Sequence, residues 1–208
     1  MHDEVTIIDE FCKLCAEVRI SFDLYRSLFE AESRTLQLYS SVAPHCFGDL
    51  NGILVEHVLI QFCKVTDPAK TGKHFNLTTN YILNEIPWPR EVAEKLAAIN
   101  DRLLTFRQKI EPARSKRIAH VDFTAQIERW PNLGKFPKGE DCAFLRDLQE
   151  FVNVAYGHFH NGESCSIVVA MSTDTYKLVR ALQQSELYDD CQKCTAGERA
   201  IAVLDAER

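Results

Sequence analysis

The sequence predicts an all-α fold, an antiparallel helical bundle with a C-terminal helical extension. In several long stretches, apolar residues recur every three or four positions, which is the spacing of one face of a helix. Proline and glycine gather between these stretches, and we find no internal repeat and no strand-rich region. We therefore expect one helical domain over residues 1–208, with its core at about 5–161 and the extension at 162–208.

The first predicted element is a long helix that begins near Ile8. Its apolar residues follow at alternating steps of three and four, and the pattern resumes at Leu36 and Tyr39 after a more polar turn. We expect one long helix with an apolar seam for neighbouring helices. The first part of the seam consists of Ile8, Phe11, Cys15, Val18, Phe22, Tyr25 and Phe29.

The stretch that connects the first helix to the next one ends at Pro44. The second helical segment is predicted at Phe47–Val65. Apolar residues occupy almost every angle of this segment, a pattern that predicts a helix at the centre of the bundle. The stretch DPAKTGKHFNLT at 67–78 contains proline, glycine and capping residues and is interpreted as a loop. A short helix at 79–85 fits before the next prolines.

A further long helix begins near Pro89, which the first turn of a helix tolerates. Its seam continues in phase through Ala113 to Arg117 and His120. Its apolar members are Leu96, Ile99, Leu103, Phe106 and Ile110.

After Asp122 the pattern loosens into a loop with Trp130-Pro131, Gly134, Pro137 and Gly139. Another amphipathic helix then carries Leu145, Leu148, Val152, Ala155 and Phe159, and Asn161-Gly162 is a plausible stop. The run SIVVAM at 166–171 is ambiguous between a short strand and a buried turn, and 174–188 is predicted to be helical.

The composition indicates a globular protein without a membrane span. Hydrophobic residues make up 46% and charged residues 26%, and no apolar run approaches the roughly 20 residues that a bilayer requires. The N-terminus MHDEVTIIDE is acidic where a signal peptide would be basic, so we expect a cytoplasmic protein with reduced thiols. A net charge of −6 argues against general coating of nucleic acid but permits a local basic site.

The stretch RSKRIAHVD at 114–122 brings cations and a histidine into the seam of the helix that begins near Pro89. Arg114, Arg117 and His120 fall within an arc of about 120° on one helix face. From Arg107 to Arg117 five cations stand against the single acid Glu111, a local charge of +4 that would attract phosphates.

Two interpretations of this basic stretch remain open. Pro112 should kink the helix or restart it, and a restart would place Arg114 beside free backbone donors. An arginine can hold a phosphate while a histidine transfers a proton, a pair suited to metal-free RNA cleavage. Alternatively, the cations favour the helix dipole, and His120 is a hydrogen-bonded core residue.

The motif resembles the HEPN superfamily, whose signature is an arginine, four to six residues, and a histidine. Arg114 and His120 have five residues between them, and RSKRIAHVD is similar to the form found in the AbiU-like abortive-infection branch. The apolar helix 47–65, the following Asp67 and then Asn76-Leu77-Thr78 are also similar to that branch. The resemblance covers about residues 22–123, and more weakly 174–182.

The resemblance implies a homodimeric helical bundle whose two motifs face each other, with metal-independent endoribonuclease activity against single-stranded RNA and no cofactor. It implies that His120 is the acid/base and that Arg114 holds the scissile phosphate. Ser115, Lys116, Arg117 and Asp122 are then the RNA-binding residues. It also implies a role in toxin-antitoxin or phage-defence systems, with a cognate antitoxin protein as a further partner.

Two positions depart from the family pattern. Ser115 stands where Asn, Asp or His is usual, and it is a weaker orienting group. Asp122 stands where members controlled by adenylylation carry tyrosine, so we do not expect that form of control. Two alternatives to a nuclease follow: a non-catalytic module that binds RNA or a nucleotide, and a structural bundle whose basic end meets an acidic partner.

Other patterns favour structural roles. The pairs Cys12/Cys15 and Cys191/Cys194 have zinc-ligand spacing, but Cys15 belongs to an apolar seam, so ordinary thiols are favoured. His158 and His160 point apart on a helix and suit its C-terminal dipole. His57, Gln61 and Lys64 form a polar stripe; we favour buried hydrogen-bonding groups over neighbours of the basic site. We find no Gly-rich phosphate loop and no nucleophile elbow.

Overall fold

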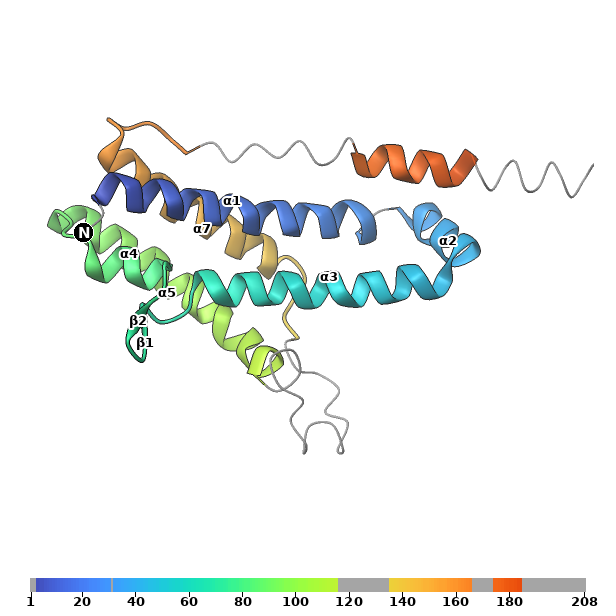
Figure 1. Ribbon diagram of the computed structural model, residues 1–208, viewed down its shortest axis with the longest axis horizontal. Coiled ribbons are helices and arrows are strands. Elements are labelled where there is room, and N and C mark those ends of the chain that lie inside the picture. Colours follow the sequence, from blue (N-terminus) through green and yellow to red (C-terminus); the bar gives the residue numbers. More distant parts are fainter. Residues whose placement is uncertain (1–2, 31, 116–134, 166–173, 185–208) are drawn as a thin grey trace, which may run out of the picture. The chain divides into compact units, whose positions relative to one another are not determined.

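A computed structural model describes residues 3–30, 32–115, 135–165 and 174–184 of the chain. These residues are mostly helical and include one small hairpin, which confirms the all-α prediction (Figure 1). The long elements are α1 (Glu4–Phe29), α2 (Ser33–Val42), α3 (Pro44–Val65), α5 (Arg90–Ala113) and α7 (Glu140–Phe159). Between α3 and α5 lie β1 (Lys70–Thr71), β2 (His74–Phe75) and α4 (Thr79–Glu85), and residues 174–184 form a further helix.

The chain divides into two compact units. The first comprises Met1–Phe22 and Leu54–Val169, and the second comprises Asp23–Ile53 and Ala170–Arg208. Helices α1 and α3 therefore each contribute to both units. The first unit contains α4, α5, α7 and the hairpin, and with them the candidate site.

The core of the first unit surrounds Phe62 of α3. The centre of its ring lies 5.8 Å from the ring centre of Phe22, 6.0 Å from that of Phe106 and 4.6 Å from that of Phe144. These rings come from α1, α5 and α7, so Phe62 joins all four long helices of the unit. Burial of one such side chain stabilises the fold by about 1.5–3 kcal/mol. The predicted seam of α5 is confirmed, since Leu96, Ile99, Leu103, Phe106, Ile110 and Ala113 are all buried.

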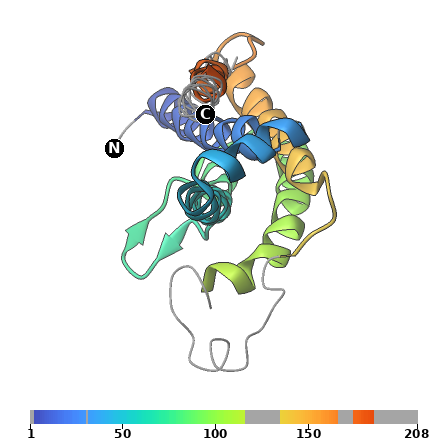
Figure 2. The same cartoon turned by 90° about the vertical axis from the view of Figure 1, so that its right-hand side faces the viewer.

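Helices α5 and α7 pack side by side in the first unit (Figure 2). At the edge of this contact Arg102 donates to Asp147 at 2.9 Å and to Glu150 at 2.6 Å. The apolar residues predicted for α7 are buried at Leu145, Leu148, Val152 and Ala155. The surface ion pairs add specificity to this contact, while the buried side chains supply most of its stability.

Several predicted boundaries are confirmed. Helix α4 covers Thr79–Glu85 as expected, because the Thr78 side chain caps it by accepting a hydrogen bond from the Tyr81 backbone N–H at 3.2 Å. Helix α7 stops where Asn161 and Gly162 take φ angles of 52° and 84°. The helix at 174–184 agrees with the prediction as far as that segment is described, and the ambiguous run 166–171 lies outside the described residues.

The single helix predicted from Ile8 to Tyr39 is wrong, because α1 ends at Phe29 and α2 begins at Ser33. At Glu32 the backbone is extended, with φ −59° and ψ 149°. Residues 30–35 supply no large apolar side chain that could hold the seam together across this point. In the second unit Tyr39 of α2 instead stacks on Phe47 of α3, with ring centroids 4.0 Å apart.

The prediction that α3 lies wholly at the centre of the bundle is also wrong. Its buried residues are Val58, Phe62, Cys63 and Val65, all near its C-terminal end. Residues 44–57 are exposed or partly exposed, and Ile53 is 62% exposed. The all-round apolar pattern reports what a helix can bury, whereas neighbouring helices decide how much of it is covered.

None of the helices in the described ranges combines the length and the apolar character needed to cross a membrane.

Candidate functional site

The described residues include two of the predicted site residues, Arg114 and Ser115, at the C-terminal end of α5. The other four, Lys116, Arg117, His120 and Asp122, lie outside the described residues.

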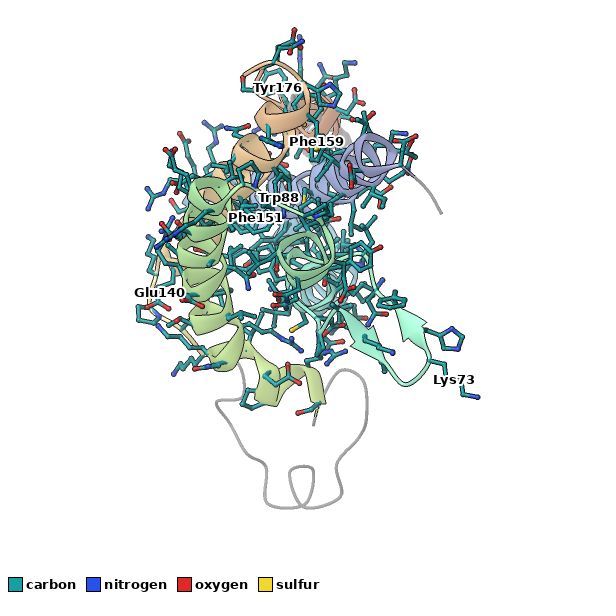
Figure 3. All side chains as sticks on the ribbon, turned by 90° about the vertical axis from the view of Figure 1, so that its left-hand side faces the viewer. Lys73, Trp88, Glu140, Phe151, Phe159 and Tyr176 are labelled. Atoms are coloured by element: carbon teal, nitrogen blue, oxygen red, sulfur yellow. The ribbon has the colours of Figure 1, made fainter. Side chains whose placement is uncertain are left out.

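Helix α5 continues through Pro112 to Ala113 and ends in a wider, π-type turn at 114–115. Its last turns change direction relative to the rest of the helix (Figure 3). The backbone N–H of Arg114 donates to the carbonyls of Ile110 and Glu111, and the Ser115 hydroxyl donates to the Glu111 carbonyl at 2.9 Å. The kink interpretation is therefore confirmed, and the restart interpretation is wrong, because the preceding helix already uses the Arg114 N–H.

Asp67, in the loop after α3, joins two arginines of α5. Arg107 Nη2 donates to its Oδ1 at 2.8 Å, and Arg114 Nη2 donates to its Oδ2 at 3.2 Å. Both carboxylate oxygens are therefore engaged by guanidinium groups. The Asp67 side chain is 18% exposed, so water screens these pairs less than it would at an open surface.

Glu111 is the second acid of this cluster. Its Oε2 accepts from Nη2 and Nε of Arg107 at 2.9 and 3.2 Å. Its Oε1 lies 3.4 Å from Arg114 Nη1. Two cations thus meet two anions, and we call Asp67, Arg107, Glu111 and Arg114 the four-residue ion cluster.

Hydrogen bonds fix the loop beneath the four-residue ion cluster. Arg107 Nη1 donates to the Thr66 carbonyl at 2.8 Å. Asn80 Nδ2 donates to the carbonyls of Thr66 and Asp67 at 3.1 and 3.0 Å, and Asn100 Nδ2 donates to Asn80 Oδ1 at 3.0 Å. The loop after α3 is therefore tied to both α4 and α5, which holds the Asp67 carboxylate at Arg114.

Burial shifts the acidity of two groups at the cluster. It raises the pKa of the Asp67 carboxyl above its ordinary value, although Arg114 and Arg107 act in the opposite direction. It also raises the pKa of the Cys63 thiol to about 11, with a smaller contribution from Glu111. Cys63 is therefore protonated at neutral pH and is a poor nucleophile.

The predicted local charge of +4 is not what the described part of the chain presents. Arg107 and Arg114 are neutralised by Asp67 and Glu111, and Lys109 contacts Glu140 of α7 at 2.7 Å. The prediction counted charges along one segment, whereas folding brings Asp67 and Glu140 to that segment from elsewhere. The remaining two cations, Lys116 and Arg117, lie outside the described residues.

A comparison with protein-family models matches residues 5–187 to the AbiU2 family of HEPN proteins. The chain belongs to the HEPN AbiU2 family. This confirms the resemblance inferred from RSKRIAHVD and places the chain among the HEPN domains of abortive infection. A search of curated proteins and a search of solved structures each gave no match.

In this AbiU2 chain, the residues that carried the resemblance upstream of the motif have structural roles. Asp67 holds Arg114, Asn76 bonds to the loop around it, and Thr78 caps α4. Sequence reasoning missed Arg107 as a partner of Asp67. The available signal was weak, because a lone aspartate after a helix does not reveal which arginine, 40 residues later, it will meet.

The polar stripe of α3 differs from its preferred interpretation. His57 is exposed; its Nε2 lies 3.2 Å from Ser21 Oγ of α1 and 3.3 Å from Gln61 Nε2. The stripe is therefore not a set of buried groups. Lys64, also exposed, lies near enough to Asp67 to act against the rise of its pKa.

The described members of the two cysteine pairs are buried, and the two histidines near the end of α7 contact aromatic rings. Cys12 and Cys15 are buried in α1, whereas Cys191 and Cys194 lie outside the described residues. His160 lies 3.0 Å from Asp9 and stacks on Tyr156, and His158 meets the Trp88 ring. Within the described ranges no group of three or more His, Cys, Asp or Glu residues could hold a metal ion.

Proposed function

We propose that this AbiU2-family chain is a metal-independent endoribonuclease of the toxin or phage-defence type that cleaves single-stranded RNA in the cytoplasm. The observation that carries the proposal is the placement of Arg114. The Arg114 side chain at the end of α5 is 33% exposed, and its guanidinium is oriented by Asp67 and Glu111. An arginine held in this way presents N–H donors in a defined direction, as phosphate recognition requires.

The proposed reaction needs one phosphate-binding group and one proton carrier. Within the described residues, Asp67 and Glu111 use two of the five N–H donors of Arg114, so three remain for a phosphate. His120 takes the proton of the ribose 2′-hydroxyl, whose oxygen attacks the adjacent phosphorus. The bond to the 5′-oxygen breaks, that oxygen takes up a proton, and a 2′,3′-cyclic phosphate and a 5′-hydroxyl result.

Dimerisation and control belong to the same proposal. HEPN domains commonly dimerise and act on RNA, and we propose a homodimer in which the two copies of Arg114 and His120 face one cleft. Ser115, Lys116, Arg117 and Asp122 would line the path of the RNA, and a cognate antitoxin protein would restrain the activity.

The test is exchange of His120 for alanine. Wild-type protein should cut single-stranded RNA in EDTA and leave cyclic-phosphate ends. The His120→Ala variant should lose cleavage and keep RNA binding. If the wild type cuts no RNA under any condition, the nuclease proposal fails.

One observation favours a second candidate function, a non-catalytic module that binds RNA or a nucleotide. The Ser115 hydroxyl donates its proton to the Glu111 carbonyl of its own helix, so in this arrangement it does not donate to a phosphate oxygen. Under this alternative the His120→Ala variant and the wild type bind RNA equally, and neither cuts it.

A further inference from the structure

The hairpin β1–β2 carries the exposed positive charge that the four-residue ion cluster lacks. Lys70 and Lys73 are both exposed, and the segment from Pro68 to Thr78 contains no acid. In the part of the chain that the structure describes, neither hairpin lysine forms an ion pair with an acid. Lys73 stands at the tip and points away from the helices (Figure 3). These cations are therefore available to an external anion.

Phe75 provides an aromatic surface beside these charges. Its side chain is 57% exposed, and its ring meets the Tyr81 ring edge-on at 5.8 Å. Lys70 pairs with Phe75 across the hairpin, and its Nζ lies 5.4 Å from the centre of the Phe75 ring. Exposed aromatic rings interleaved with cations are the usual means of gripping single-stranded nucleic acid, since bases stack on the rings and phosphates meet the cations.

The hairpin is held in shape by its own sequence. Gly72 takes a φ angle of 61° in the turn, which a residue with a side chain rarely adopts. Asn76 closes the base, because its Nδ2 donates to the Pro68 carbonyl at 2.9 Å and to Thr71 Oγ1 at 2.8 Å. A surface that is ordered before binding loses less entropy when a ligand arrives.

The hairpin begins close to the four-residue ion cluster. Lys70 follows Asp67 by three residues, a chain distance of at most about 11 Å. Because Asp67 contacts Arg114 at 3.2 Å, a strand bound along the hairpin could pass on to that arginine.

We propose that the hairpin Lys70–Phe75 is a binding surface for single-stranded RNA, in which a base stacks on Phe75 and phosphates contact Lys70 and Lys73. This proposal rests on the proposed function, since the hairpin would hold the RNA substrate whose phosphate Arg114 engages.

The test is fluorescence anisotropy with a labelled single-stranded RNA of about 12 nucleotides, using full-length protein with His120→Ala so that the RNA stays intact. Adding Phe75→Ala should weaken binding about 5- to 150-fold. Phe75→Leu keeps an apolar contact with Tyr81 but has no ring, and should also weaken binding. Circular dichroism should show that both variants stay folded.

The double variant Lys70→Ser/Lys73→Ser should make the negative slope of log affinity against log salt concentration less steep by about 1.4, the effect of two lost phosphate contacts. The matched control is Lys13→Ser with Lys95→Ser, which removes two exposed lysines already paired with Glu10 and Glu91. This control should leave the slope unchanged.

The hairpin proposal is overturned if the folded hairpin variants bind RNA as tightly as their parent, or if the parent binds no RNA. Cleavage by the wild type tests the nuclease proposal separately. If the wild type cleaves RNA and the hairpin variants bind RNA as tightly as their parent, only the hairpin proposal is refuted. If the hairpin variants lose RNA binding but the wild type cleaves no RNA, only the nuclease proposal is refuted.

Discussion

Arg114 Nη2 lies 3.2 Å from Asp67 Oδ2, although the two residues are 47 positions apart in the sequence. The other oxygen of the same carboxylate accepts from Arg107 at 2.8 Å. The proposed phosphate-binding arginine thus depends on an acid from another element for its orientation. Asp67 is a positioning residue in this arrangement, and Arg107 holds Asp67 in place.

Asp67→Asn should lower the free energy of unfolding by about 1–3 kcal/mol, because it removes the charge that Arg107 and Arg114 share. Urea unfolding measures this difference. Asp147→Asn is the matched control; Arg102 keeps Glu150 as a partner, so the loss should stay below about 1 kcal/mol. Equal losses in the two variants would contradict the central place of Asp67.

The two arginines of the cluster should respond differently to substitution. Arg107 is 14% exposed and also bonds the Thr66 carbonyl, so Arg107→Ala should cost about 2–4 kcal/mol of stability. Arg114 is 33% exposed, and Arg114→Ala should cost about 1 kcal/mol or less. The effects on RNA cleavage should have the opposite order. Arg114→Ala should be inactive although it stays folded, whereas the fraction of Arg107→Ala that stays folded should lose less activity. A stability loss for Arg114→Ala as large as that for Arg107→Ala would instead assign Arg114 a structural role.

Arg114→Lys offers a sharper test of phosphate recognition. Lysine keeps the charge but cannot make the two parallel hydrogen bonds of a guanidinium. We expect cleavage to fall at least about 10-fold, while the free energy of unfolding changes by less than about 1 kcal/mol. Full activity in Arg114→Lys would show that charge alone is sufficient at this position.

Cys63 should make stability depend on pH in the alkaline range. The folded protein raises the pKa of its thiol from 9.0 to about 11, so the unfolded chain ionises first as the pH rises. The stability contributed by the protonated thiol is fully present below pH 9 and is lost between pH 9 and about pH 11, by about 2–3 kcal/mol. Urea unfolding under reducing conditions should show a smaller loss over this window in Cys63→Ala than in the wild type. Parallel curves for the two proteins would refute the assignment.

Phe62 and Phe75 form a matched pair for testing the core. Phe62 is 1% exposed and touches three other rings, so Phe62→Ala should cost about 3–5 kcal/mol. Phe75 is 57% exposed, and Phe75→Ala should cost about 0.5 kcal/mol or less. Thermal or urea unfolding distinguishes the two, and a large loss for Phe75→Ala would mean that this ring serves the fold.

The sequence by itself determined the features that depend on neighbouring residues. Helical spacing predicted α5 and its buried seam, the loop residues and prolines on either side predicted α4, and Asn161-Gly162 predicted the end of α7. The motif from Arg114 to His120 identified the family, which the match over residues 5–187 confirms. Such signals are local because helix spacing, capping and chain stops act over a few residues.

Only the tertiary structure decided which charges are paired and which apolar faces are covered. Asp67 and Glu140 reach α5 from other elements, and together with Glu111 they neutralise Arg107, Lys109 and Arg114, the cations of the basic segment that the structure describes. Helix α3 has apolar residues at almost every angle, yet only Val58, Phe62, Cys63 and Val65 are buried, because burial depends on which neighbours fold against it. Ion pairing and burial depend on which residues lie close together in the folded protein. Residues far apart in the sequence come close only when the whole chain folds, so the pattern of one segment does not reveal them.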